Sequence, residues 1–290
     1  MKKRILFIVN PISGTGKQKI IEQLVPKHLD TSIFEYKIIY TKAPKHATEL
    51  SKKAVINNID IVVAVGGDGA VNEAGIGLMG SNTALAIIPT GSGNGLARHL
   101  KIPLEIAKAL EIINTQHCTT IDTVSINNST FFNIAGIGLD AHIAWEFAKL
   151  KKRGFLSYLK LLLKELPTYK AREYELNILG EITRHTALII SFANASQYGN
   201  NATIAPQANL QDGIVDVCIL KKVPFYALPL LAYQMFSGNI HQSKYIEIIQ
   251  TKALSIQQQS LKAHIDGEAF ETGKVINVSV NPLTLKVIIP

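Results

Sequence analysis

The sequence predicts an α/β protein of two parts: an open, doubly wound parallel sheet, followed by a mainly antiparallel β-sandwich with helical insertions. Up to about Thr119, apolar runs alternate with amphipathic segments, and a glycine-rich or polar turn follows each run. Beyond that point polar and apolar residues alternate with a period of two, as in strands that bury one face. With 290 residues, 47% of them hydrophobic and 18% charged, the chain is long enough for two domains.

The first part is expected to alternate strands with helices. A βαβα order predicts parallel strands joined by crossover helices, and therefore a doubly wound sheet. The expected strands are Ile5–Val9, Glu35–Tyr40, Ile59–Val65 and Ala84–Ile88, and the expected helices are Lys17–His28, Pro44–Asn57 and a segment after Gly69.

A glycine-rich or polar loop follows each of these strands. The loops begin at Asn10, Thr41, Gly66 and Pro89. In open α/β sheets, ligands bind beyond the carboxyl ends of the strands. Such loops on one edge of a sheet predict a nucleotide-binding site.

The loop at 66–69 reads Gly-Gly-Asp-Gly and follows an apolar strand. Glycines let peptide N–H groups approach an anion closely, and a helix that starts near Ala70 adds the favourable end of its dipole. Asp68 puts a carboxylate into this anion-attracting loop, which makes sense if a cation such as Mg²⁺ lies between it and phosphate groups. A tight turn without a ligand is the alternative.

Two common nucleotide-binding motifs do not fit. The segment around Gly16 and Lys17 lacks the earlier glycine and the following Ser or Thr of a P-loop. No Gly-x-Gly-x-x-Gly follows the first strand, which argues against a dinucleotide-binding dehydrogenase.

Two helical insertions interrupt the β-rich second part. The first, at about 140–166, places basic residues between Lys149 and Arg153 beside leucine and aromatic residues up to Leu163, and the second is Pro224–Phe236. Cations beside such side chains suit a membrane interface or an apolar substrate. An ordinary amphipathic helix that packs on the sheet is an equally good interpretation of the first insertion.

The net charge and the motifs limit the classes of molecule that the protein is expected to bind. The formal net charge of +8 is compatible with nucleic acid, phosphorylated small molecules or an anionic membrane. No signature of an RNA-binding sheet or a helix-turn-helix is present, so we expect no nucleic-acid partner.

Cys118 and Cys218 lack metal or redox spacing and are expected to be free thiols in a reducing compartment. No apolar segment is long enough for a transmembrane helix, and the short run after the N-terminal basic residues is expected to be a strand, not a signal peptide.

Phosphoryl transfer needs a phosphate cradle, a metal and a group that deprotonates or orients the acceptor. Carboxylates that are candidates to complete such a site are found at turns or at the junction of the two parts: Asp122, Asp212, Asp216, Asp266 and Glu268. A carboxylate beside a glycine most often serves only to form a turn. Spacing alone therefore does not identify any one of these residues as catalytic.

Taken in order, several motifs resemble the diacylglycerol kinase catalytic-domain family, which includes soluble bacterial lipid kinases and the sphingosine and ceramide kinases. The motifs are Gly66-Gly67-Asp68-Gly69-x-x-Asn72-Glu73, Pro89-x-Gly91-Ser92-Gly93-Asn94, Asn133-Ile134-Ala135-Gly136-Ile137-Gly138, Asp212-Gly213 and Asp266-Gly267-Glu268. NAD kinases and phosphofructokinases share Gly-Gly-Asp-Gly, whereas the later motifs make the set specific. The resemblance covers essentially the full chain and implies a first domain similar to those of NAD kinases and phosphofructokinases.

The resemblance implies an ATP- and Mg²⁺-dependent lipid kinase that transfers the γ-phosphoryl group to a lipid hydroxyl in a cleft between its domains. Asp68 is then expected to organise the phosphates through Mg²⁺, directly or through water, with Asp122 nearby. Glu268 matches the family's general base. The residues expected to line the ATP site are Asn10, Pro11, Ser13, Gly14, Thr41, Gly66, Gly67, Asp68, Gly69, Asn72, Glu73, Gly91, Ser92 and Asn94.

A second metal is also implied by the resemblance. In bacterial members an Asp-Gly turn carries a structural Mg²⁺, which maps here to the side chain of Asp212 and the backbone carbonyls of Asn209 and Ile214.

The family's C-terminal strand returns to the first domain. The expected domains are therefore residues 1–120 with 282–290 for the nucleotide and residues 121–281 for the lipid. The expected location is the cytoplasm, with peripheral contact to the inner face of the membrane through Lys149–Leu163; a homodimer is compatible with this arrangement.

The loop at 91–95 departs from many bacterial members, because it reads Gly-Ser-Gly-Asn-Gly instead of Gly-Thr-x-Asn-Asp. Ser92 keeps a hydroxyl for ATP, and the loop is closer to the sphingosine and ceramide kinase form. Diacylglycerol-like and sphingoid acceptors therefore both stay open. The alternative functions are a soluble-substrate kinase such as an NAD kinase and a nucleotide-binding regulatory protein without turnover.

Overall fold

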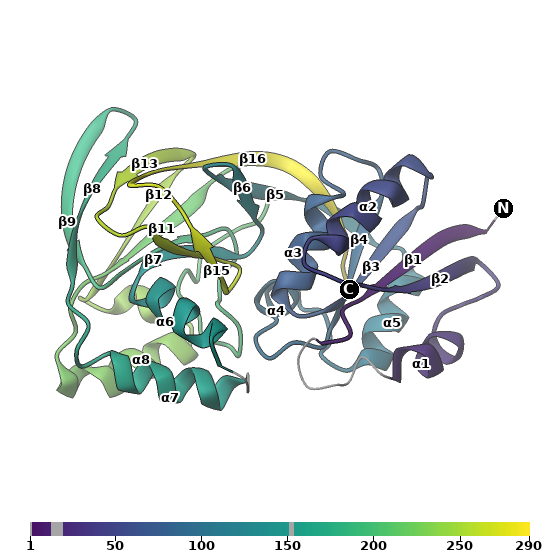
Figure 1. Cartoon of the computed structure of the whole chain (residues 1–290), viewed down its shortest axis with the longest axis horizontal. Coiled ribbons are helices and arrows are strands. Elements are labelled where there is room, and N and C mark those ends of the chain that lie inside the picture. The colour runs from purple at the N-terminus through teal and green to yellow at the C-terminus, as the bar shows by residue number, and fades with distance from the viewer. Residues whose placement is uncertain (1, 13–19, 151–153) are drawn as a thin grey trace. The chain divides into compact units, whose positions relative to one another are not determined.

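The computed structural model describes residues 2–12, 20–150 and 154–290, and the chain divides into two compact units (Figure 1). The first unit comprises Met1–Ile121 and Leu283–Pro290, and the second comprises Asp122–Pro282. The second unit is therefore inserted ahead of the last strand residues of the first.

The first unit contains a parallel sheet with helices on both faces, which confirms the predicted fold class. Its strand order is β2 (Phe34–Tyr40), β1 (Lys3–Val9), β3 (Ile61–Gly66), β4 (Ala84–Pro89) and the end of β16 (Val275–Ile288), with parallel neighbours throughout. The helices are α1 (Ile21–His28), α2 (His46–Ile56), α3 (Asp68–Ile76), α4 (Gly95–His99) and α5 (Ile106–Thr115). Helix α2 packs on α3 and α1 packs on α5, and Figure 1 shows these pairs on opposite sides of the sheet.

The apolar runs found in the sequence form the centre of this sheet. Every residue of β3 and β4 is buried, because helices cover both faces of a parallel sheet. Helix α2 begins at His46, two residues later than expected. The reason is local: Lys45 has a left-handed backbone with a φ of 66°, which a continuous helix does not allow.

The second unit is a sandwich of two antiparallel sheets, as predicted. One sheet has the order β12 (Ile246–Thr251), β11 (Val215–Leu220), β10 (Ile189–Ala193), β7 (Ile134–Gly138), β14 (Lys262–Ile265) and β15 (Glu268–Glu271). The other combines the first part of β16 with β13 (Ala253–Gln257), β8 (Arg172–Ile178), β9 (Glu181–Ala187), β5 (Cys118–Ile126) and β6 (Ser129–Phe131). Side chains from both sheets, among them Leu176, Phe192 and Ile256, form one apolar core between them.

The first helical insertion forms two helices, α6 (Leu139–Ala148) and α7 (Phe155–Glu165), within the expected range. Helix α7 follows Gly154, whose φ of 148° favours glycine. The second insertion forms η2 (Phe225–Ala227), α8 (Leu228–Phe236) and η3 (Ile240–Gln242). Pro229 lies in the first turn of α8, where no backbone N–H is needed.

No helix in the described part of the chain has the length and apolar character that crossing a membrane requires. Cys118 and Cys218 are both free, as expected.

Candidate active site

The predicted ligand-binding loops all leave the same edge of the first unit's sheet. The parallel register aligns Val9 with Tyr40 and Val65, and Gly66 with Pro89. The loops after β1, β2, β3 and β4 therefore start side by side, at the edge where open α/β sheets bind ligands.

The carboxylate of Asp68 joins two of these loops. Asp68 is the first residue of α3 and is half-buried. Its Oδ2 accepts the N–H of Asn94 at 2.9 Å, and its Oδ1 accepts the N–H of Gly95 at 2.7 Å. Asp68 therefore positions the start of α4 relative to α3. A carboxylate is also the kind of oxygen ligand that Mg²⁺ takes.

Glycines allow the same two loops to touch. A Cβ on Gly91 would lie 2.5 Å from the Cα of Gly67, and a Cβ on Gly66 would lie 2.4 Å from the Cβ of Ala70. Asn94 has a left-handed backbone, with a φ of 54°, and its side chain closes the loop through hydrogen bonds to the N–H and carbonyl of Gly91 at 3.0 and 2.9 Å. Close packing between backbones thus requires small residues here, in addition to any need to approach an anion.

Glu73 supports the loop that follows β2. Its Oε1 accepts the N–H of Lys45 at 2.9 Å, and its carbonyl accepts the hydroxyl of Thr48 at 2.7 Å. Thr41, at the start of this loop, donates its N–H to the carbonyl of Val9 at 2.9 Å. These bonds give Glu73 a structural task, and its contact with ATP stays a prediction.

The loop after β1 begins with a local turn. Asn10 donates its N–H to the carbonyl of Val65 at 3.1 Å, and its Oδ1 accepts the N–H of Ile12 at 3.1 Å. Pro11 is exposed within this turn. Ser13 and Gly14, two of the predicted ATP-site residues, lie outside the described residues.

The remaining first-unit candidates lie on α3 and at the tip of the fourth loop. Gly69 and Asn72 are half-buried in α3, and Ser92 is exposed at the tip. The guanidinium of Arg98 donates from Nε to the carbonyl of Gly93 at 3.0 Å, so α4 also holds this loop.

Asp122 belongs to the second unit and holds the predicted structural-metal loop. It is fully buried, its Oδ2 accepts the N–H of Gly213 at 2.7 Å, and its own N–H donates to the carbonyl of Leu210 at 2.6 Å. In the same loop, Oδ1 of Asp212 accepts the N–H of Ile214 at 3.0 Å. Asp122 thus fixes this loop through both its side chain and its backbone, a relationship that the sequence did not reveal.

Oxygen ligands for a hard cation are present in this loop. Asp212 and Asn209 are exposed, and the set of one carboxylate and two carbonyls is of the kind that Mg²⁺ and Ca²⁺ take. Over the described residues, no group of three or more His, Cys, Asp or Glu is arranged to hold a metal. A metal ion at Asp212 would therefore depend on backbone carbonyls.

Glu268 lies at the end of a tight hairpin turn. Ile265 pairs with Glu268, and Asp266 and Gly267, with φ values of 47° and 83°, form the two-residue turn between them. The carboxylate of Asp266 turns inward and accepts N–H groups from three consecutive residues: Phe132, Asn133 and Ile134, at 3.2, 2.9 and 3.1 Å. The exposed carboxylate of Glu268 is therefore carried by a turn that a buried carboxylate anchors.

The predicted catalytic residues divide between the units. Asp68 is in the first unit, and Asp122 and Glu268 are in the second.

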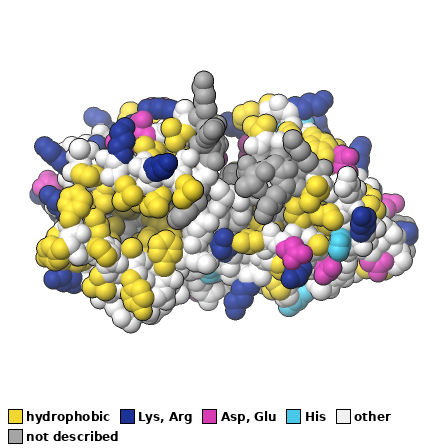
Figure 2. Space-filling view, turned by 90° about the horizontal axis from the view of Figure 1, so that it is seen from below, with side chains coloured by type: hydrophobic (Ala, Val, Ile, Leu, Met, Phe, Trp, Pro, Cys, Tyr) yellow, Lys and Arg dark blue, Asp and Glu magenta, His cyan; other side chains and the backbone are white. Residues whose placement is uncertain are grey.

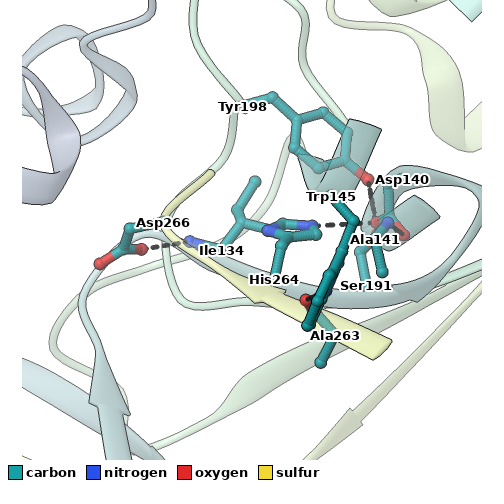
Figure 3. Close-up of polar contacts among 9 residues, drawn as sticks. All are labelled: Ile134, Asp140, Ala141, Trp145, Ser191, Tyr198, Ala263, His264 and Asp266. Atoms are coloured by element: carbon teal, nitrogen blue, oxygen red, sulfur yellow. Dashed lines mark hydrogen bonds and ion pairs between the residues drawn. The ribbon is translucent and has the colours of Figure 1, made fainter. Parts of the chain in front are cut away.

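A buried polar cluster that the sequence did not predict lies in the second unit (Figure 3). Oδ2 of Asp140, at the start of α6, lies 3.1 Å from Nε2 of His264 and accepts the hydroxyl of Ser191 at 3.2 Å. The hydroxyl of Tyr198 donates to the same oxygen at 3.5 Å. Asp140 and His264 are 6% and 4% exposed, so this cluster is shielded from solvent.

Burial shapes the chemistry of this cluster. It raises the pKa of Tyr198 well above the ordinary value, and the neighbouring charge of Asp140 raises it further, so the phenol stays protonated as a donor. Within the described part of the chain, Nδ1 of His264 has no hydrogen-bond partner. The indole of Trp145 donates to the carbonyl of Ala263 at 3.1 Å and so fixes α6 on the strand that carries His264.

The cluster was missed because its members come from four separate segments of the chain. One sequence signal was present. A Cβ on Gly136 would lie 2.3 Å from Oδ2 of Asp140 and 2.8 Å from Nε2 of His264, so the glycine in the Asn133–Gly138 motif makes room for this pair.

The fold and these motifs agree with comparisons to known proteins. Residues 4–126 match the model of the diacylglycerol kinase catalytic domain, and residues 133–289 match that of the YegS C-terminal NAD kinase beta sandwich-like domain. A diacylglycerol kinase of Bacillus subtilis (strain 168) is 29% identical over 275 residues, which cover 92% of this chain and 90% of that protein. A diacylglycerol kinase of Staphylococcus aureus (strain Newman) is 29% identical over 277 residues, with coverage of 92% and 87%.

Solved structures show the same fold. The crystal structure of a diacylglycerol kinase from Bacillus anthracis str. Sterne matches with a TM-score of 0.76 at 21% identity, over 99% of this chain and 97% of that one. A further structure from this organism matches with a TM-score of 0.79 at 24% identity, with the same coverage. The two family models together span nearly the whole chain, and the chain belongs to the family of lipid kinases that share the diacylglycerol kinase catalytic domain.

Proposed function

We propose that this lipid kinase uses ATP and Mg²⁺ to phosphorylate a lipid hydroxyl, and that a diacylglycerol-like lipid is the first acceptor to test. Family membership supports the reaction class, and the names of the relatives from B. subtilis and S. aureus support this acceptor over a sphingoid one. The observation that carries the proposal is the placement of Glu268, an exposed carboxylate on a turn that Asp266 anchors.

The loops of the first unit would bind the nucleotide. Backbone N–H groups at 66–69 and the N-terminus of α3 attract phosphate oxygens. Asp68 would serve this site in two ways, by holding the loop at 91–95 and by acting as an oxygen ligand for a cation. Bound Mg²⁺ would offset the negative charge on the transferring phosphoryl group.

Glu268 would supply the general base. As the lipid oxygen forms a bond to the γ-phosphorus, the bond from that phosphorus to the β,γ-bridging oxygen breaks, and ADP leaves with the electron pair. The hydroxyl proton goes to the carboxylate of Glu268.

Asp122 would act through the loop that it holds. Its bond to Gly213 fixes the segment from Asn209 to Ile214. That segment would bind the structural Mg²⁺ through the side chain of Asp212 and two backbone carbonyls.

A lipid substrate also bears on the proposed cellular location and membrane contact. We propose that the protein works in the cytoplasm at the inner face of the membrane, with Lys149–Leu163 as its peripheral contact. A homodimer fits this arrangement and is a further proposal.

The test compares Glu268→Gln with Glu271→Gln, because both residues are exposed on β15 of the same hairpin. Purified protein receives radiolabelled ATP, Mg²⁺ and mixed vesicles that contain diacylglycerol and sphingosine. We expect a labelled lipid from the unaltered protein and from Glu271→Gln. We expect turnover at least about 100-fold lower from Glu268→Gln, with nearly unchanged ATP affinity.

Three other results of these assays would each lead to a different conclusion about the base or the function. Unchanged turnover in Glu268→Gln means that another group is the base. Label in NAD but in no lipid means a soluble-substrate kinase. ATP binding without turnover on a broad lipid panel means a nucleotide-binding regulatory protein.

A further inference from the structure

A histidine side chain holds the loop that follows β2, one of the loops proposed to bind the nucleotide. Nδ1 of His46, the first residue of α2, accepts the N–H of Lys42 at 3.1 Å. His46 is half-buried, and its own N–H donates to the carbonyl of Ala43 at 3.2 Å. The imidazole therefore ties the start of this loop to the start of the helix that follows it.

The bond from Lys42 to His46 helps to fix the backbone of Thr41. Thr41 donates its N–H to the carbonyl of Val9 at 2.9 Å, so the peptide group before Thr41 is attached to β1. The peptide group after Thr41 carries the N–H of Lys42, which His46 holds. Because peptide groups are planar, only the two backbone torsions of Thr41 lie between these fixed groups. Val9 and His46 together thus set the direction of the Thr41 carbonyl and of its Cα–Cβ bond.

The far end of the loop is held without the imidazole of His46. Oε1 of Glu73, on α3, accepts the N–H of Lys45 at 2.9 Å, and the carbonyl of Glu73 accepts the hydroxyl of Thr48 at 2.7 Å. These two bonds attach the beginning of α2 to α3. Loss of the contact between His46 and Lys42 should therefore loosen the start of the loop while α2 stays in place.

The same bond shows which chemical feature of His46 the loop uses. A backbone N–H donates only to a ring nitrogen that bears no hydrogen, so the hydrogen of the neutral ring is on Nε2. An asparagine carries its Oδ1 on the γ carbon, where histidine carries Nδ1, and this oxygen is also an acceptor. The loop therefore needs an acceptor at this position, which asparagine can supply and alanine cannot.

We propose that His46 is a positioning residue of the nucleotide site, whose Nδ1 holds Thr41 in the conformation that binds ATP. The proposal deepens the proposed function and rests on it, because it takes the loop after β2 to contact the nucleotide. In this role His46 acts through Thr41 and contacts neither the lipid hydroxyl nor the transferring phosphoryl group. Its loss should therefore weaken the binding of ATP and leave the chemical step unchanged.

The experiment compares His46→Ala with His46→Asn. Hydrogen–deuterium exchange of residues 41–45, measured without nucleotide, should be about three- to tenfold faster at Lys42 in His46→Ala, because one hydrogen bond is lost. Equilibrium dialysis with radiolabelled ATP and Mg²⁺, without lipid, should show binding weaker by about the same factor. In the lipid assay the KM for ATP should rise in parallel, with kcat within about twofold of that of the unaltered protein. His46→Asn should restore exchange, ATP binding and KM.

A matched control is available in the same unit. His28, the last residue of α1, is likewise half-buried, and its Nδ1 lies 3.1 Å from Oε1 of Glu111 on α5. Figure 2 shows acidic, basic and histidine side chains interspersed on the side of the first unit where Figure 1 places α1 and α5. Single ion pairs on such a surface contribute little to stability. His28→Ala should therefore match the unaltered protein in exchange at residues 41–45, ATP binding and KM.

Equal ATP binding by His46→Ala and the unaltered protein would overturn this proposal and leave the proposed function standing. Equal losses in His46→Ala and His46→Asn would also overturn it, because they would mean that the size of the ring matters and not its acceptor. A fall in kcat at constant KM for ATP would contradict it as well. If exchange changes as expected but even the unaltered protein binds no ATP, the proposed function fails, and the nucleotide role of His46 fails with it.

Discussion

The carboxylate of Asp266 accepts the N–H of Asn133 at 2.9 Å, and the two residues are 7% and 4% exposed. The same carboxylate also binds the N–H groups on either side of Asn133. Asp266 thus ties the β14–β15 turn to the segment that leads into β7. Because Glu268 follows two residues later, the position of the proposed base depends on this buried anchor.

Asp266→Asn should therefore lower both stability and turnover. The asparagine amide has one acceptor oxygen, whereas both oxygens of the Asp266 carboxylate now accept N–H groups. The free energy of unfolding should therefore fall by about 1–3 kcal/mol. Turnover should drop while the KM for ATP stays constant, because the loops proposed to bind the nucleotide belong to the first unit. Urea denaturation and steady-state kinetics measure these effects.

Asp30 provides the control for that substitution. Its carboxylate accepts the N–H of Ser32 in an exposed turn, so Asp30→Asn should destabilise the protein much less than Asp266→Asn and leave turnover unchanged. A raised KM for ATP with constant turnover in Asp266→Asn would contradict the positioning role.

Asp68→Asn should reduce turnover by about 100-fold or more, because it removes the charge that faces the proposed cation. Asp60 lies just before the other end of β3 and likewise accepts a backbone N–H, from Arg4 at 2.7 Å. Asp60→Asn should keep full turnover. If the two variants lose activity equally in a phosphorylation assay, Asp68 serves structure alone.

Gly136→Ala should destabilise the second unit by about 1–3 kcal/mol, because the new methyl group would collide with the Asp140–His264 pair. At Gly273 the nearest atom to an added Cβ is 3.5 Å away, an ordinary contact, so Gly273→Ala should be close to neutral. Thermal denaturation compares the two, and equal melting temperatures would mean that the pair moves aside without cost.

Asp216→Asn should stabilise the protein at neutral pH. Burial raises the pKa of Asp216 above its ordinary value of 3.8, and among the described residues its Oδ2 has no hydrogen-bond partner. A raised pKa means that the folded state favours the protonated acid, so its stabilising contribution is complete below pH 3.8 and is lost as the pH rises through the folded-state value.

The melting temperature of Asp216→Asn should therefore exceed that of the unaltered protein at pH 7, and the difference should vanish near the acid end of this range. Oδ1 of Asp216 accepts the side-chain amide of Gln250 at 2.9 Å, and asparagine can keep this bond. A gain that is independent of pH would point to packing instead of ionisation.

The sequence was sufficient for features encoded within short segments. The apolar run at β3, its glycine loop and Asp68 were found because a buried parallel strand has no polar residue to interrupt it. The β-rich second part was recognised from strands such as β16, whose buried and exposed residues alternate over residues 275–279.

Features that depend on distant partners were not predictable in this way. Strand β7 is buried at every position and so shows no alternation, and β14 and β15 have four residues each. Asp266-Gly267 was correctly identified as a turn, but its inward carboxylate depends on residues more than 130 positions earlier. The bond between Asp122 and Gly213 and the convergence on Asp140 are of the same non-local kind.

Because the end of β16 follows the second unit in the sequence, the sheet of the first unit is completed late in translation. This end pairs in parallel with β4, at Val287 and Leu85, and the N–H of Ile289 reaches the carbonyl of His117 at 2.9 Å. Until these residues leave the ribosome, β4 is an unpaired edge of an otherwise synthesised sheet, the kind of edge that invites wrong pairing. The first unit is thus begun first but completed last, after the whole inserted second unit has been synthesised.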